Sequence, residues 1–155
     1  MTDPEDDVDY VTLHNVLYYI YTGTVNLHIR PAEQQNFDIS HPDGYPEEPD
    51  PYCLYRNADK FLLPFLKDRC YAHLKHSVTP ENVAERLFHQ ECEQHEELRI
   101  LYLEYLLANY NKVKATEGWR TVLCGDLDEL PLSVIKYRNR LFFEISQELA
   151  CTVTK

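Results

Sequence analysis

The chain has 155 residues, of which 44% are hydrophobic and 12% aromatic, so about one domain with a packed core is expected. Its formal net charge of −11 opposes binding to a nucleic-acid backbone or to an anionic membrane surface, and no apolar run reaches the roughly 18 residues that a membrane span needs. We therefore expect a cytosolic or nuclear protein that binds neither nucleic acid nor membrane.

The N-terminal residues predict a helix from about Asp7 to Tyr21. Five acids occur from Asp3 to Asp9, where they favour the positive end of a helix dipole. Apolar side chains then follow at helical spacing and form one apolar face. Gly23 stands where a helix commonly ends in a left-handed residue.

An insert is expected at about residues 28–51. Between Pro31 and Pro51 the chain holds five of its nine prolines and six acids, with no Lys or Arg. Proline lacks a backbone donor and the acids repel one another, so this stretch cannot build a packed element. A loop of this length is either functional or disordered, and we expect disorder.

Two helices are predicted next, over residues 51–62 and 65–76. Pro51 and Pro64 each favour a first helical turn. The residues expected on the apolar faces are Leu54, Ala58, Phe61 and Leu62 in the first helix and Phe65, Leu66, Cys70 and Leu74 in the second.

Two further helices are predicted over residues 80–90 and 96–111. Thr79 supplies an N-cap and Pro80 a first-turn proline for the shorter one. Residues 96–111 are apolar around nearly the whole circumference, which is typical of a helix that is buried on several sides or bound by a partner.

The C-terminal part predicts a helix over residues 132–149, followed by a frayed tail at residues 150–155. Upstream of it, Gly118 breaks the chain and Trp119 supplies a large apolar anchor for the core. The five cysteines are odd in number and widely spaced, so we expect buried, reduced thiols rather than disulfides; they are Cys53, Cys70, Cys92, Cys124 and Cys151.

Three short motifs follow one another along the chain: the Tyr21-Thr22-Gly23 helix end, the Ala58-Asp59-Lys60-Phe61 segment before a Leu-rich helix, and Gly118-Trp119 after a further pair of helices. Together they resemble the second half of a BTB/POZ domain of the speckle-type class and the helical extension that follows it. The resemblance covers roughly residues 10–27 and 52–122. It implies a mainly α fold, with the helical C-terminal half of a BTB/POZ-like α/β fold in residues 1–78 and a BACK-like helical extension in residues 79–149.

The first half of such a domain has no room before the first predicted helix. That half would carry a strand pair, a dimer-forming helix and the short motif with which family members grip cullins. Without it, the apolar faces of residues 10–21 and 52–74 lack their sheet partners, and exposed apolar surface of that extent invites partner binding or aggregation.

The resemblance implies a non-enzymatic protein–protein interaction module, an adaptor or scaffold of a cullin-based ubiquitin ligase. Its partners would be a cullin or another BTB chain, and it would need no cofactor, metal or catalytic residue. We place the expected partner-binding surface on the second helix of the extension, at Leu107, Ala108 and Asn111. The motif residues would have structural roles.

Two alternatives stay open at this point. Cys70, His73, Cys92 and His95 occur in two Cys/His triplets and could form a zinc site if their helices packed side by side, which would make the chain a zinc-stabilised helical domain. The chain could also be a truncated, non-functional BTB fragment. A Cys–His hydrolase is not expected, because the acids around Cys92 would raise the pKa of its thiol.

Overall fold

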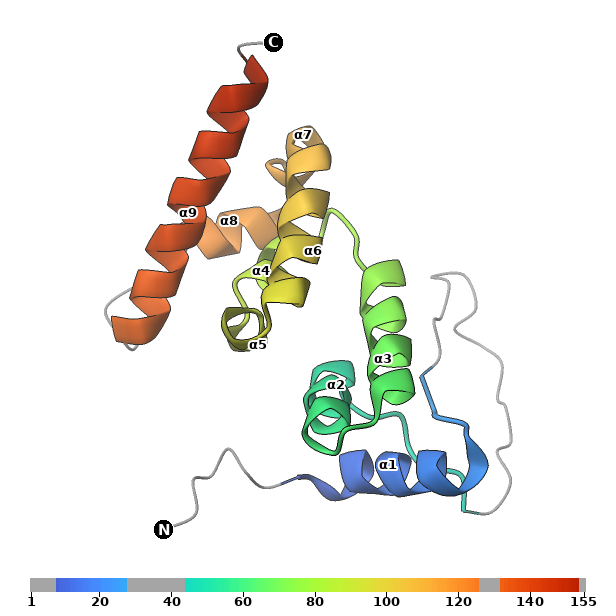
Figure 1. The fold of residues 1–155 in the computed structure, drawn as a ribbon. Helices are drawn as coiled ribbons and strands as arrows, with labels where there is room; N and C mark the ends of the chain where they lie inside the picture. The colour runs from blue at the N-terminus through green and yellow to red at the C-terminus, as the bar shows by residue number, and fades with distance from the viewer. Residues whose placement is uncertain (1–7, 28–43, 126–131, 154–155) are drawn as a thin grey trace. The chain divides into compact units, whose positions relative to one another are not determined.

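The computed structural model describes residues 8–27, 44–125 and 132–153, and every regular element in these ranges is helical. The prediction of a mainly α fold is therefore confirmed for the described residues, whereas the BTB-like character stays a prediction. The chain divides into two compact units, Met1–Ser77 and Val78–Lys155 (Figure 1). Each unit is described by itself. Of the predicted insert, residues 28–43 lie outside the described residues, and residues 44–50 contain no helix or strand.

Helix α1 spans Tyr10–Thr22 and begins and ends with the predicted signals. The Asp9 side chain accepts a hydrogen bond from the Thr12 backbone N–H at 2.9 Å, which caps the N-terminus. Gly23 closes the C-terminus in the left-handed region, at a φ of 70°, where its N–H bonds the Tyr19 carbonyl. The predicted helix end at Gly23 is therefore confirmed, and the helix starts three residues later than expected.

The orientation of α1 is the main surprise of the first unit. Its inward face carries Thr12, Asn15 and Val16, two of which are polar. Its outward face carries the large apolar side chains, which are Tyr10, Leu13, Leu17, Ile20 and Tyr21. The single apolar face that the sequence predicts therefore exists, and it points to solvent.

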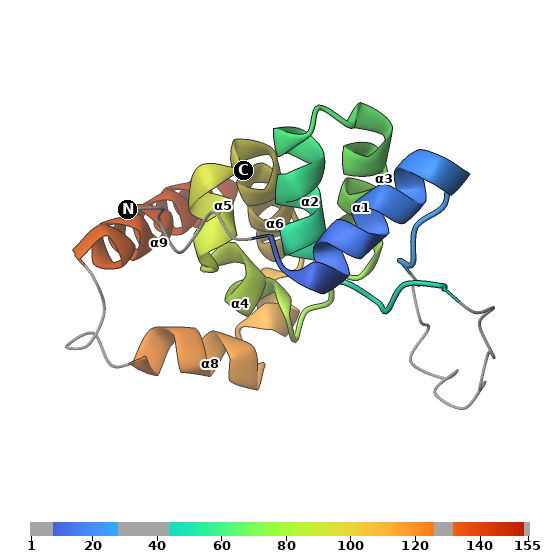
Figure 2. The same cartoon turned by 90° about the horizontal axis from the view of Figure 1, so that it is seen from below.

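Helices α2 (Pro51–Lys60) and α3 (Pro64–His76) pack against each other, and α1 packs on α2 in the same unit (Figure 2). Asp50 caps α2 by accepting from the Cys53 N–H at 3.0 Å. The apolar core of the unit is buried between these helices and consists of Val16, Leu54, Tyr55, Ala58, Leu66, Cys70 and Leu74. Most of the predicted core positions of α2 and α3 are thus confirmed.

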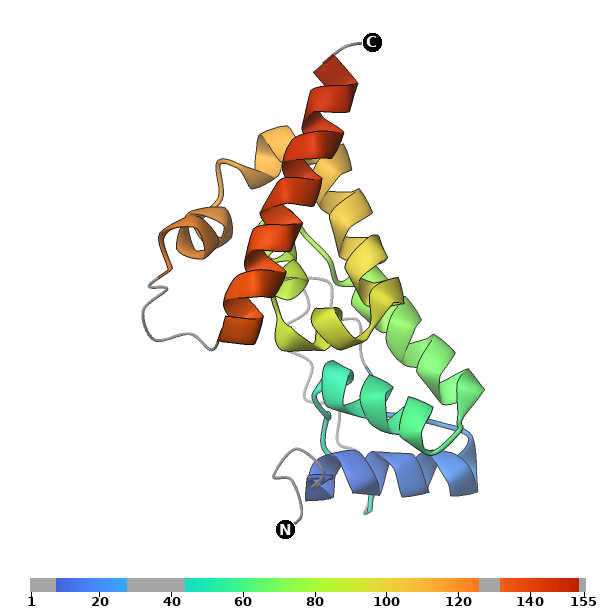
Figure 3. The same ribbon diagram turned by 60° about the vertical axis from the view of Figure 1, so that its left-hand side comes forward.

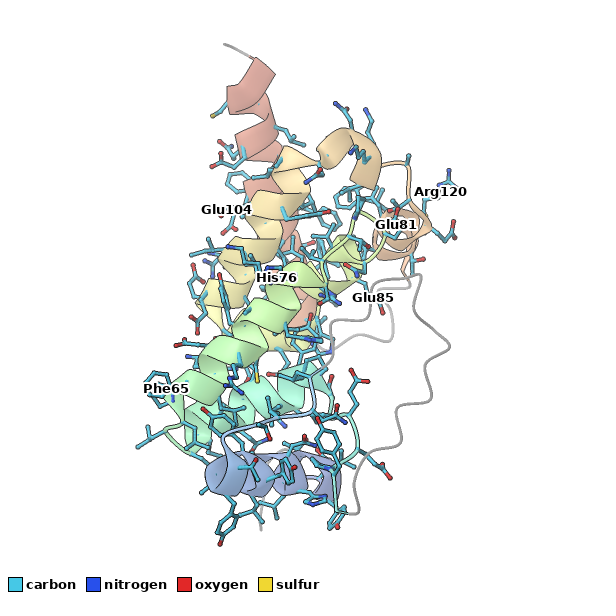
Figure 4. All side chains as sticks on the ribbon, turned by 90° about the vertical axis from the view of Figure 1, so that its right-hand side faces the viewer. Phe65, His76, Glu81, Glu85, Glu104 and Arg120 are labelled. Atoms are coloured by element: carbon cyan, nitrogen blue, oxygen red, sulfur yellow. The ribbon has the colours of Figure 1, made fainter. Side chains whose placement is uncertain are left out.

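Three predicted core residues are instead exposed at the α2–α3 turn. Leu62 is 85% exposed, Phe65 is 73% exposed and Phe61 is 42% exposed. The reason is that α2 ends at Lys60, two residues earlier than expected, and Leu62 takes a left-handed conformation with a φ of 55°. The Leu63 N–H then bonds the Ala58 carbonyl at 2.8 Å, which turns Phe61 and Leu62 away from the core. Figure 4 shows Phe65 pointing outward at the start of α3.

The second unit contains α4 (Val83–Leu87), α5 (Gln90–Gln94), α6 (Glu96–Ala108), α7 (Tyr110–Val113), α8 (Glu117–Cys124) and α9 (Leu132–Val153). The helix expected over residues 80–90 is wrong in extent, because residues 80–82 form a turn and a second short helix begins at Gln90. The helix expected over residues 96–111 is interrupted at Asn109. Helix α9 continues to Val153, so residues 150–153 of the expected frayed tail are helical.

Gly118 does not break the chain as expected but lies in the first turn of α8. A side-chain carbon at this position would clash with the backbone carbonyl oxygen of Glu81, so only glycine permits the close approach of the turn before α4 to α8. Figure 4 labels Glu81 and Arg120, which come from these two segments. Trp119 is buried, as predicted for a core anchor.

Candidate functional site

A hollow of about 640 Å³ lies where α6 ends and α7 begins, with one wall supplied by α9. Figure 1 and Figure 3 show α7 continuing from the end of α6 and the C-terminal part of α9 beside both. We call this feature the α7 hollow. It is lined by Leu107, Ala108, Asn109, Tyr110, Asn111, Lys112 and Leu149.

Asn109 lines the hollow and interrupts an otherwise continuous apolar helix. Its N–H bonds the Tyr105 carbonyl at 3.1 Å, and its side-chain amide donates to the same carbonyl at 3.0 Å. Its own carbonyl then accepts from the N–H groups of Lys112 and Val113, which starts α7. An asparagine can satisfy a helix end and start the next turn in this way because its short side chain competes for backbone groups.

Aromatic side chains hold α7 and α8 in place around the hollow. The Trp119 ring meets the Tyr110 and Phe142 rings edge-on, with distances between ring centres of 6.0 Å and 6.1 Å. The centre of the Phe142 ring lies 5.0 Å from that of the Phe88 ring. Edge-to-face pairs of this kind contribute about 0.5–1.5 kcal/mol each beyond the burial of their area. Tyr110 is therefore a fixed wall of the hollow.

An ion-pair network holds α9 against α6. The Arg99 guanidinium donates to Glu96 on its own helix and to Glu144 on α9, and Arg140 also donates to Glu144, at 3.1 Å. Arg99 is buried, and its hydrogen bonds with Glu96 raise its pKa further above the ordinary value. The Tyr137 hydroxyl adds a hydrogen bond of 2.9 Å to the Leu87 carbonyl. These contacts fix the register of α9 that brings Leu149 to the hollow.

The α7 hollow differs in charge from the rest of the chain. Residues 105–116 contain no acid and two lysines, in a chain with a formal net charge of −11. Lys112 lines the hollow and is exposed, and the Lys114 ammonium lies 5.9 Å from the centre of the Tyr110 ring. An apolar segment that carries an acidic group would complement this surface.

The structure brings the three predicted partner-binding residues together. Leu107, Ala108 and Asn111 all line the hollow, and Ala108 and Asn111 are exposed. The sequence analysis missed Lys112 and Leu149. The break at Asn109 could have been suspected, because asparagine is common at helix ends, but the contribution of Leu149 depends on how α9 packs.

None of the motif residues behind the BTB resemblance is among the residues that line the hollow. Tyr21, Thr22 and Gly23 end α1, whereas Ala58, Asp59, Lys60 and Phe61 end α2. Gly118 and Trp119 belong to α8, where Trp119 is buried and Gly118 is half-buried. Ala58 and Trp119 are buried, whereas Tyr21 is 85% exposed and Phe61 is 42% exposed, so a structural role for the whole set stays a prediction.

The four residues of the zinc alternative are divided between the two units, with Cys70 and His73 in the first and Cys92 and His95 in the second. In the part of the chain that the structure describes, no three His, Cys, Asp or Glu side chains converge on one point. Cys70 and Cys92 are buried, and burial raises the pKa of each thiol to about 12. A cysteine binds zinc as a thiolate, so metal binding at either sulfur would have to displace its proton. The expectation of buried thiols is wrong for Cys124 and Cys151, which are exposed.

No protein-family model matches the chain. The chain is similar to protein maternal effect lethal 26 of Caenorhabditis elegans, with 28% identity over 120 residues. The match covers 77% of this chain and 26% of that protein, so the chain spans about a quarter of that relative's length. Of the helices described, none is both long and apolar enough to cross a membrane.

Proposed function

We propose that the chain is a non-enzymatic protein–protein interaction module, similar to the adaptor of a cullin-based ubiquitin ligase. Its binding surface is the α7 hollow, and its partner is a segment of a cullin. The proposal joins the BTB/POZ resemblance of the sequence motifs to the geometry of the second unit, and it concerns the adaptor role of the protein as a whole.

The observation that carries the proposal is the clustering of Leu107, Ala108 and Asn111 in one hollow. Its volume, about 640 Å³, falls within the range of roughly 300–1,000 Å³ that is usual for ligand pockets. A few large side chains of a partner could fill such a space. The fixed ring of Tyr110 supplies the type of rigid aromatic wall that is enriched at protein interfaces.

Two features support a role without catalysis. Burial raises the pKa of the Cys92 thiol to about 12, so this cysteine is protonated at neutral pH and a poor nucleophile. The α7 hollow is lined by leucines, an alanine, asparagines, a tyrosine and one lysine, a set without the paired nucleophile and base of a hydrolase.

The test is a matched pair of variants in which an alanine is replaced by glutamate. Ala108→Glu places a charged side chain at the exposed rim of the hollow, whereas Ala72→Glu makes the same change at an exposed position of α3. Calorimetric titration with purified cullin should show that Ala108→Glu lowers the affinity at least about tenfold, equivalent to about 1.4 kcal/mol. Ala72→Glu should bind like the wild type. Equal affinities for the two variants, or no binding by the wild type, would reject the proposal.

A further inference from the structure

Thr79 carries an exposed hydroxyl group that makes no contact within the fold. It lies in the non-helical segment before α4, in the second unit. Of the Ser and Thr hydroxyls that the structure describes, only those of Thr79 and Thr121 make no hydrogen bond, and Thr121 lies within α8. The other described hydroxyls are hydrogen-bonded, and they belong to Thr12, Thr22, Thr24, Ser77, Thr116 and Ser146. A group added to the Thr79 Oγ1 atom would therefore displace no hydrogen bond.

The backbone of Thr79, in contrast to its side chain, is fixed by hydrogen bonds. Its N–H donates to the Asn82 side-chain oxygen at 2.8 Å. Its carbonyl oxygen accepts from the N–H groups of Asn82, at 3.2 Å, and Val83, at 3.0 Å, which starts α4. Figure 4 labels Glu81 and Glu85, which follow Thr79 in this turn and in α4. The turn therefore holds its shape through backbone groups and Asn82, and it leaves the Thr79 side chain exposed.

The residue after Thr79 is a proline, and this pairing occurs once in the chain. Of the nine prolines, only Pro80 follows a serine or a threonine. Proline has no backbone N–H, so an enzyme pocket that closes over the residue after the hydroxyl leaves no donor without a partner. Proline also favours an extended conformation in the residue before it. Both properties suit a kinase that accepts a hydroxyl residue only when proline follows.

We propose that Thr79 is a phosphorylation site for a proline-directed protein kinase that uses ATP with magnesium. The Thr79 Oγ1 atom attacks the γ-phosphorus of ATP, and a new oxygen–phosphorus bond forms. The bond between the γ-phosphorus and the oxygen that bridges it to the β-phosphorus breaks, and ADP leaves. The hydroxyl proton passes to the aspartate of the kinase catalytic loop. The product is phosphothreonine at residue 79.

The sequence around Thr79 supplies no lysine or arginine that would pair with the phosphate. Residues 76–85 contain Glu81 and Glu85 but no Lys or Arg. The Arg86 guanidinium, which follows them, lies 6.0 Å from the centre of the Tyr102 ring. The phosphate adds about 1.5 to 2 negative charges at neutral pH. The modification should therefore add charge at the surface without rearranging the second unit, and it does not depend on the α7 hollow.

Phosphorylation of the purified, full chain tests the site. The chain is incubated with ATP, magnesium and two proline-directed enzymes, a cyclin-dependent kinase and a mitogen-activated protein kinase, and tandem mass spectrometry locates the phosphate. Thr79 should be modified, Thr79→Ser should keep the phosphate and Thr79→Val should lose it. Pro80→Ala should slow the reaction at least about tenfold, because alanine restores the backbone N–H. A chain that neither kinase modifies at Thr79, or a Pro80→Ala chain that reacts like the wild type, would overturn the proposal.

Two further measurements test whether the folded chain itself is the substrate. A synthetic peptide of residues 73–85 should react within about tenfold of the rate of the folded chain, because Thr79 is already exposed. Thr121, which is exposed but helical and has no proline after it, should stay unmodified. The phosphorylated chain should keep the unfolding midpoint that Trp119 fluorescence reports for the unmodified chain. Phosphate that appears only on the peptide, or a midpoint lowered by phosphorylation, would overturn the proposal that the fold presents Thr79 for modification.

Discussion

The side-chain amide of Asn15 lies 2.7 Å from the backbone carbonyl oxygen of Glu47, 32 residues further along the chain. The same amide donates to Val11 in its own helix, at 2.9 Å. Nearby, the Asn26 amide donates to the Pro46 carbonyl at 2.8 Å. Two buried asparagines thus tie α1 to the segments that follow it and give these backbone groups hydrogen-bond partners.

Replacing Asn15 by alanine should destabilise the first unit by about 1–3 kcal/mol, because the buried Asn26 N–H would lose its acceptor and the Glu47 carbonyl would lose its donor. Chemical denaturation followed by far-UV circular dichroism measures the change. Asn111→Ala, at an exposed position of α7, should leave the midpoint unchanged. If Asn15→Ala has the same denaturation midpoint as the wild type, the orientation of α1 described above is wrong.

Gly118→Ala should cost about 1–3 kcal/mol, since the added methyl group meets the Glu81 carbonyl oxygen. Gly23→Ala tests a different requirement, because the space around it is open and only the left-handed backbone opposes a side chain, at a cost of about 1 kcal/mol. Trp119 is the single tryptophan of the chain and reports unfolding of the second unit by its fluorescence. If the unfolding midpoint followed by this fluorescence is the same for Gly118→Ala and the wild type, the close approach of α8 to the Glu81 carbonyl does not exist.

Leu62→Gly should stabilise the chain by about 1 kcal/mol, because a left-handed conformation at a φ of 55° costs a leucine roughly that amount and costs glycine little. The leucine side chain does not offset this cost by burial, because it is exposed. Leu62→Ala is the control and should bring no gain, since alanine keeps the same backbone cost. Thermal melts of the three chains should therefore place the glycine variant highest, and equal melting temperatures would argue against the strained turn.

The Glu96 carboxylate should make stability depend on pH in the acid range. Its hydrogen bond from Arg99 holds its pKa below the ordinary value of 4.5, so ionised Glu96 stabilises the folded chain above that pH. This contribution is lost as the pH falls through the lowered folded-state pKa. Denaturation midpoints measured from pH 6 to about pH 3 should fall less steeply for Glu96→Gln than for the wild type. Parallel curves would show that the Arg99 pair does not form in solution.

Local signals explain which parts of the fold could be predicted. Gly23, Pro51 and Pro64 fix helix ends through their own backbone chemistry, and the structure places helix boundaries at all three. The orientation of α1 could not be predicted, because it depends on hydrogen bonds that Asn15 makes to distant segments. The turn at Leu62 was missed because a left-handed leucine contradicts the usual preference of its residue type.

The candidate site shows the same division between local and distant information. Ala108 and its neighbours could be placed on a helix surface from their spacing alone. The lining of the hollow combines Asn109, which interrupts the helix, with Leu149 of α9, and no local pattern links these two residues. The part-buried ion pair of Arg99 with Glu144 joins residues 45 positions apart, so no local pattern could reveal it.

Hydrogen–deuterium exchange of the whole chain, with and without saturating purified cullin, tests the proposed binding surface most directly. Bound partner should slow the exchange of backbone amides around the α7 hollow, in peptides that cover residues 107–113 and 146–151. Peptides from α3 should exchange at the same rate in both samples. The account would be contradicted if cullin slowed amide exchange only outside the peptides of the hollow. It would also be contradicted if saturating cullin slowed exchange nowhere in the chain.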